Sequence, residues 1–96
     1  MVTIVNIVEA TQPGGVHGYK YLGIYESAGS IGGALETLAY IKNEPTNEYT
    51  ESNLGMAREH LASGIQEFRE RVAAVKDETL REQWLSALET VHEASA

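Results

Sequence analysis

The stretch SNLGMAREHLASGIQEFRERVAAVK, residues 52–76, decides the fold of the second half of this chain. It contains no proline, and its apolar residues recur at spacings of three, four and seven. The members of this apolar stripe are Leu54, Ala57, Leu61, Ile65, Phe68, Val72 and Val75. Such a stripe is typical of one long amphipathic helix that packs on a core or on a partner.

A shorter helix is expected before this stretch. Apolar residues recur at helical spacing over residues 31–41, and Ser30 is suited to cap the first turn. The helix is expected to end near Asn43 or Glu44, because the residue before Pro45 is pushed out of helical geometry.

A third helix is expected after the long one. The apolar stripe loses its phase around residues 76–79, and a new apolar face begins at Leu80. Thr79 followed by Glu82 fits the spacing of a capping box. These features favour a break and a third helix that runs to about Glu93, with a single kinked helix as the alternative.

The first 33 residues have a different composition, with seven of the nine glycines of the chain. Residues 2–8 are almost all β-branched, and in residues 19–25 tyrosines alternate with Leu22 and Ile24, so both segments are predicted as strands. The sequence QPGG at 12–15 suits a turn between them. The expected fold is therefore α+β: an N-terminal two-stranded antiparallel hairpin followed by three helices, the central one long and amphipathic.

Length and charge limit the classes of function. Ninety-six residues make a single domain, with the hairpin and a glycine-rich turn in 1–33 and the helical part in 34–96. The absence of cysteine excludes disulfides, thiolate nucleophiles and zinc–thiolate sites. The formal net charge of −7 makes direct nucleic-acid binding unexpected, because that needs clustered Lys and Arg, and a protein partner with a basic surface fits better. The acidic residues either keep the chain soluble or mimic a nucleic-acid backbone.

The longest early apolar run bears on location. Residues 2–8 lack a basic flank and are too short for a signal-peptide core or a membrane span. A cytoplasmic protein that does not enter a membrane is therefore expected.

A glycine-rich segment between the second predicted strand and the next helix is the candidate ligand site. Backbone N–H groups at a helix start attract phosphate or carboxylate, and glycine lets a ligand approach the backbone. The candidate residues are Ser27, Gly29, Ser30, Gly32 and Gly33, with His17 from the preceding loop. The pattern matches neither a Walker loop nor the dinucleotide fingerprint, so the glycines either form a tight corner or bind an anion such as a nucleotide.

Three tyrosines, Tyr19, Tyr21 and Tyr25, share one face of the second predicted strand. They pack in the core, form a protein interface or stack on bases, and the sequence leaves these alternatives open. No catalytic site, metal site or cofactor is expected, since Asp77 is the only aspartate and the three histidines are far apart in sequence.

The long apolar stripe also bears on assembly. At 1.5 Å per residue it spans about 32 Å, more than a two-stranded hairpin and a short helix can cover. A homo-oligomer, most simply a dimer, is therefore expected. Its interface residues would be Leu54, Leu61, Ile65, Phe68 and Val72, with Tyr19, Tyr21 and Tyr25 on the hairpin.

The leading functional hypothesis is a small acidic, non-enzymatic interaction protein that occupies a partner surface as an inhibitor or regulator and acts as a homo-oligomer. In size and acidity the chain is similar to many small phage-encoded inhibitors, which is a likeness of class and not of motif. The alternative is a protein that binds or sequesters a nucleotide or another phosphorylated metabolite with the glycine-rich segment.

Overall fold

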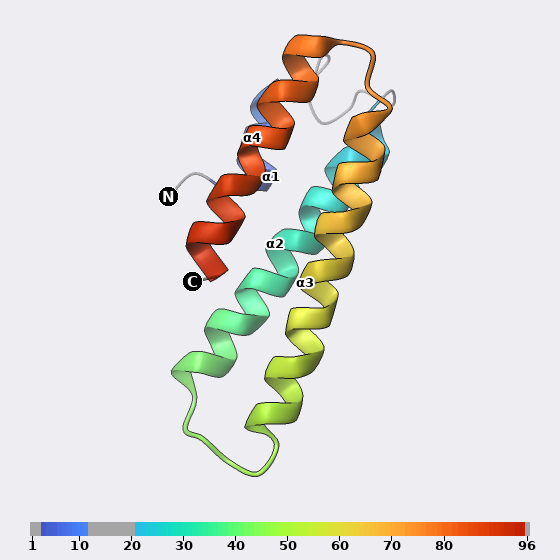
Figure 1. The fold of residues 1–96 in the computed structure, drawn as a ribbon. Coiled ribbons are helices and arrows are strands. Elements are labelled where there is room, and N and C mark those ends of the chain that lie inside the picture. Colours follow the sequence, from blue (N-terminus) through green and yellow to red (C-terminus); the bar gives the residue numbers. More distant parts are fainter. Residues whose placement is uncertain (1–2, 12–20, 96) are drawn as a thin grey trace.

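The computed structural model describes residues 3–11 and 21–95, and this part of the chain forms four helices (Figure 1). They are α1 (Ile4–Thr11), α2 (Leu22–Asn43), α3 (Thr50–Ala73) and α4 (Glu78–Ser95). The molecule is elongated, with extents of 46 × 23 × 22 Å. Its length follows from α2 and α3, which form a long antiparallel hairpin (Figure 1).

The other two helices lie against one half of this hairpin. Helix α4 runs back along α3 and α2, and α1 packs between α2 and α4 (Figure 1). The core therefore sits at the end of the molecule where all four helices meet. Its largest fully buried side chains are Trp84, Phe68, Ile4, Ile31, Val8, Val72 and Val91.

The predicted α+β fold is wrong, because the described residues contain helices and no strand. Helix α1 replaces most of the first predicted strand. Its buried residues Ile4 and Val8 are four apart and share one side of the helix. In a strand Asn6 would lie on the same face as these two residues, but Asn6 is exposed. The turn predicted at 12–15 and the start of the second predicted strand lie outside the described residues.

The second predicted strand and the glycine-rich turn are both part of α2, which begins at Leu22 instead of near Ser30. Glycine in a helix interior costs about 1 kcal/mol relative to alanine, so a turn was expected where several occur. Tertiary contacts override this at some positions. A Cβ on Gly32 would lie 3.2 Å from Cγ2 of Val5, so this glycine lets α1 approach α2 closely.

The helical part of the prediction is confirmed. Helix α2 ends at Asn43, two residues before Pro45. Residues 74–77 separate α3 from α4, so there are two helices and not one kinked helix. The cap of α4 is Asp77 and not Thr79: the N–H of Leu80 donates to Oδ1 of Asp77 at 3.1 Å.

Candidate functional site

The end of the hairpin that α1 and α4 do not reach is the candidate functional surface (Figure 1). We call residues 36–60 the distal arm; they comprise the last turns of α2, the connecting loop and the first turns of α3. Within the distal arm only Leu38 and Ala57 are buried. A two-helix element with so few buried side chains adds little to the core.

The distal arm carries the most exposed large apolar side chains of the described residues. Tyr40 is 68% exposed, Tyr49 62% and Met56 57%. Tyr49 and Met56 are seven residues apart, about two helical turns, which places them on the same side of α3. Tyrosine and methionine are enriched in protein interfaces. Because Tyr40, Tyr49 and Met56 are largely exposed, they add little to the packing of the core.

The opposite side of the arm continues the surface on which α1 and α4 pack. On α2, residues at seven-residue spacing pass from Ala28, which is fully buried, to half-buried Leu35 and then to exposed Lys42. On α3, the same spacing passes from fully buried Val72 to half-buried Ile65 and exposed Arg58. Both helices therefore change from apolar to basic where the covering helices end.

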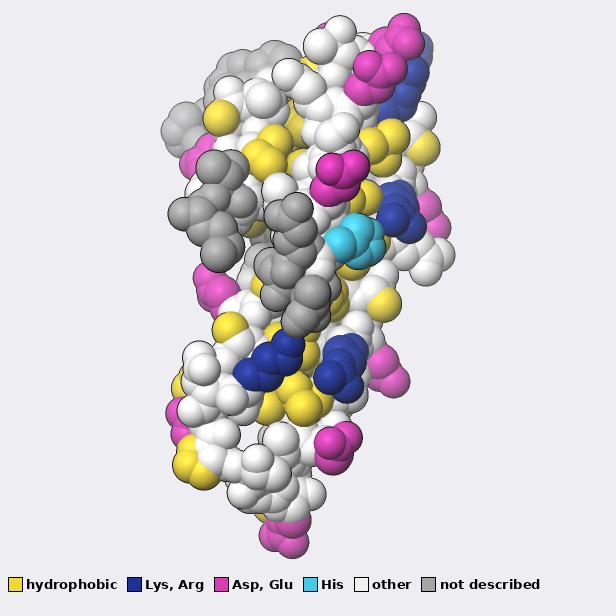
Figure 2. Space-filling view, turned by 60° about the vertical axis from the view of Figure 1, so that its left-hand side comes forward, with side chains coloured by type: hydrophobic (Ala, Val, Ile, Leu, Met, Phe, Trp, Pro, Cys, Tyr) yellow, Lys and Arg dark blue, Asp and Glu magenta, His cyan; other side chains and the backbone are white. Residues whose placement is uncertain are grey.

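We call this surface the open face and define it by six residues: Leu35, Ala39 and Lys42 on α2, and Arg58, Ala62 and Ile65 on α3. Ala39 and Ala62 are exposed and lie one helical turn from their neighbours in this set. Figure 2 shows apolar side chains between two basic side chains in the lower half of the molecule. The only Lys and Arg of the distal arm are Lys42 and Arg58.

The two sides of the arm differ in charge. The arm also contains Glu36, Glu44, Glu48, Glu51 and Glu59, and all five are exposed. Met56 is nine residues from Ile65, about two and a half turns, so it points away from the open face. The arm thus combines a basic, apolar side with a remaining surface that is acidic and carries aromatic residues.

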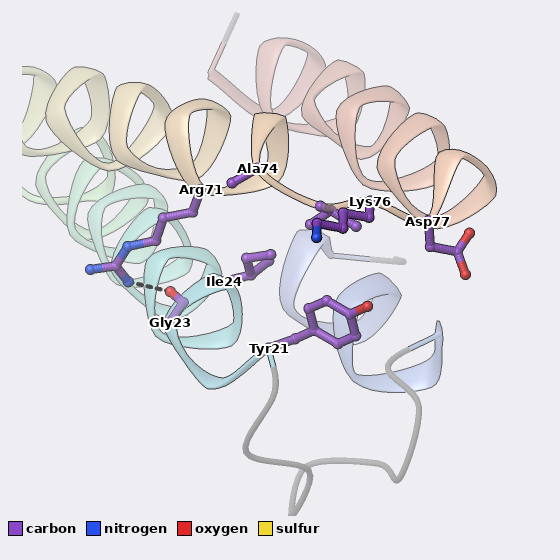
Figure 3. Close-up of a pocket in the computed structure, with 8 residues that line it drawn as sticks. Tyr21, Gly23, Ile24, Arg71, Ala74, Lys76 and Asp77 are labelled. Carbon is purple, nitrogen blue, oxygen red and sulfur yellow. Dashed lines mark hydrogen bonds between the residues drawn. The ribbon is translucent and has the colours of Figure 1, made fainter.

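A second feature is a pocket of about 710 Å³ at the other end of the hairpin, near the start of α2 (Figure 3). Its lining residues are Tyr21, Gly23, Ile24, Arg71, Ala74, Val75, Lys76 and Asp77. Arg71 crosses from α3 to α2, where its Nη1 donates to the carbonyl of Gly23 and to Oγ of Ser27 at 3.1 Å. Its Nη2 pairs with Glu67 at 2.5 Å. Arg71 and Asp77 therefore already hold helices in place, which makes this pocket a structural junction.

Removing the hydrogen bonds of Arg71 is expected to lower the free energy of unfolding. Arg71→Met keeps the apolar stem but removes the Nη1 donor that bonds the Gly23 carbonyl and the buried Ser27 hydroxyl, so we expect a loss of about 1–2 kcal/mol in the free energy of unfolding. Urea denaturation followed by circular dichroism measures it. Arg69→Met, at an exposed position on the same helix, is the control and should change stability by less than about 0.5 kcal/mol. Equal effects of the two variants would contradict the structural role of Arg71.

The residues predicted to hold an anion lie in the middle of a helix. Ser27, Gly29, Ser30, Gly32 and Gly33 all belong to α2, whose first residue is Leu22. Oγ of Ser27 donates to the Gly23 carbonyl at 2.9 Å, as is common for serine inside a helix. The ligand hypothesis depended on a helix start at these glycines, and that start is absent. His17 lies outside the described residues.

The residues predicted as an oligomer interface are covered largely by the chain itself. Leu61, Phe68 and Val72 are buried, and Leu54 and Ile65 are half-buried against the same core. Tyr21 is buried and meets Trp84 edge-on, with ring centroids 5.1 Å apart, while Tyr25 is half-buried. Tyr19 is outside the described residues. Helix α2 supplies most of the cover of α3, and α1 and α4 complete the core, so a second copy is not needed to cover these residues.

None of the helices in the described part of the chain is both long enough and apolar enough to cross a membrane. Among the described residues, no three His, Asp or Glu side chains come together as ligands for a metal ion.

The chain was also compared with known proteins. A scan against protein-family models, a search of curated proteins and a search of solved structures each found no significant match.

Proposed function

We propose that this chain is a small non-enzymatic interaction protein that occupies the surface of a protein partner and thereby inhibits or regulates it. The observation that carries the proposal is the distal arm. It extends beyond the four-helix core and presents Tyr40, Tyr49 and Met56 to solvent. Side chains of this kind are common anchors of protein interfaces, and a partner that covers them would gain apolar contacts that the single chain leaves unused.

The charge around these anchors supports a partner with a basic surface. Five glutamates accompany Tyr40, Tyr49 and Met56 in the distal arm, in a chain whose net charge is −7. Opposite charge on a partner would steer the encounter and fix its orientation. The homo-oligomer expected from the long apolar stripe is not part of this proposal, because most of the stripe is buried within one chain and Leu54 and Ile65 are half-buried there.

Site-specific photo-crosslinking in the native cell tests the proposal. A photoreactive phenylalanine analogue is placed at Tyr40 or Met56, and at Leu85 on α4 as the control, because Leu85 is also exposed but lies outside the arm. We expect one protein to be crosslinked from both arm positions and not from position 85. The same adducts from all three positions, or none from the arm, would contradict the proposal.

With the partner identified, Tyr40→Ala combined with Met56→Ala gives the quantitative test. Truncating two interface anchors is expected to weaken binding at least about tenfold. Because both side chains are largely exposed, stability should change by less than about 0.5 kcal/mol. Calorimetric titration measures the first effect and thermal denaturation the second.

A further inference from the structure

We propose that the open face is a separate docking groove that receives an acidic amphipathic helix of a partner protein. This surface continues the one on which α1 and α4 pack, toward the end of the hairpin that the described helices α1 and α4 do not reach (Figures 1 and 2). It lies on the side of the arm opposite Met56, so it can be occupied independently of the surface proposed above. The inference therefore stands or falls separately from the proposed function.

The shape of the groove suits a helix. Leu35 and Ile65 supply apolar contacts, and they are already half-buried against the core. Ala39 and Ala62 are small and exposed, so an incoming helix can approach the backbones of α2 and α3 closely. In the other half of the hairpin the same two helix surfaces pack against helices of the chain itself, which shows that this geometry accepts helices.

The charge of the groove selects an acidic occupant. Lys42 and Arg58 flank the apolar part of the open face, whereas the rest of the arm carries glutamates. A helix with leucine-like residues on one side and carboxylates along both edges would place opposite charges next to Lys42 and Arg58. Such pairs add specificity to a helix that lies in an apolar groove.

Charge and area argue against a second copy of this chain in the groove. Two open faces packed in the same direction, about a two-fold axis along the hairpin, would bring two Lys42 and two Arg58 side chains together. The stretches 35–42 and 58–65 each extend only about 10 Å along their helices. A face of that length accommodates about two turns of one helix and falls short of the roughly 800 Å² per partner that a stable dimer buries.

A binding assay with two synthetic peptides tests the inference. The probes are 14-residue amidated peptides with leucine at every third or fourth position and either glutamate or lysine along both edges. Fluorescence anisotropy with the full chain should show at least tenfold tighter binding of the glutamate peptide. Amide chemical-shift changes should centre on the open face. No binding of the glutamate peptide at millimolar protein, or shifts centred elsewhere, would overturn the inference.

Variants separate charge from shape. Lys42→Glu combined with Arg58→Glu should reverse the preference between the two peptides. The matched control, Arg69→Glu combined with Lys76→Glu, makes the same change in net charge at exposed positions outside the arm and should leave the preference intact. Ala62→Trp fills the groove without changing charge and should abolish binding of both peptides. An unchanged preference in the first variant would overturn the inference.

Analytical ultracentrifugation tests whether a second copy of this chain occupies the open face instead. The wild-type chain is expected to sediment without self-association through this face. A concentration-dependent dimer that Ala62→Trp abolishes would assign the open face to a second copy and overturn the inference.

Discussion

Trp84→Ala is expected to lower the free energy of unfolding by about 3–5 kcal/mol, the usual cost of truncating a large buried aromatic residue. Trp84 is fully buried on α4, and its ring meets Tyr21 edge-on. Its Nε1–H donates to Oγ1 of Thr11 at 2.7 Å, which ties the end of α1 to α4. A domain of this size is stable by about 5–15 kcal/mol in total, so the variant should be close to unfolding at 37 °C. Urea denaturation followed by circular dichroism measures the change.

Two further variants test how much of this loss comes from the Trp84–Thr11 hydrogen bond and whether the loss is specific to a buried position. Thr11→Val keeps the shape of the side chain but leaves the indole N–H without its acceptor, and it should cost about 1–3 kcal/mol. Leu85→Ala, next in sequence to Trp84 but exposed, should change stability by less than about 0.5 kcal/mol. A loss below about 1 kcal/mol for Trp84→Ala would show that α4 does not depend on this contact.

Gly64→Leu is expected to destabilise the hairpin by about 3 kcal/mol, because overfilling a packed contact forces side chains and backbone to shift. Gly64 is buried where α3 packs against Ile31 of α2. A Cβ at this position would already lie 3.2 Å from Cγ1 of Ile31 and 3.5 Å from the Ile31 backbone nitrogen. The remaining atoms of leucine would have to separate the two helices. Thermal and urea denaturation measure the effect.

Gly29→Ala is the matched control for this prediction. A Cβ on Gly29 would meet nothing within 4 Å, so alanine should stabilise α2 by about 0.5–1 kcal/mol through its better helix propensity. The two glycines thus have opposite expected signs although both lie inside helices. Destabilisation by Gly29→Ala, or tolerance of Gly64→Leu, would contradict the packing of α2 on α3.

The helices of the second half were predictable from residue spacing. The stripe from Leu54 to Val75 is long enough that only a helical period fits it, and Pro45 fixes where the preceding helix ends. The loss of phase after Val75 indicated the break, although the capping residue was placed two positions too late. Spacing alone favours Thr79, because Thr79 and Glu82 match a capping box, whereas the hydrogen bond from the Leu80 N–H identifies Asp77 as the cap.

The first half was mispredicted because short segments fit two periods. In residues 4–8, buried positions four apart satisfy a helix and β-branched composition satisfies a strand, and the contact with α2 and α4 decides between them. Tyr21, Ile24 and Ala28 continue at helical spacing into α2, but the glycines of residues 23–33 suggested a turn. Packing contacts outweigh the low helix propensity of glycine there. At Gly32, for example, the absence of a side chain leaves room for Val5 of α1.

The candidate surfaces were missed for a related reason. Extending the seven-residue spacing from Leu35 to Lys42, and from Ile65 back to Arg58, reveals apolar positions that become basic at the same end of the hairpin. That comparison requires knowing that α2 and α3 pair antiparallel along their whole length. The position of Tyr40 and Tyr49 on an arm beyond the core likewise depends on where α4 ends.

The length of the distal arm and the stability of the core depend on different residues of this protein. Because few of the arm's side chains enter the core, its length can change by whole heptads, with seven residues removed from or added to each helix, while Trp84, Phe68 and their neighbours keep their contacts. The connecting loop at residues 44–49 is exposed and would tolerate an inserted label. The distance between the folded body and the tip is therefore expected to be adjustable by sequence changes that leave the core contacts in place.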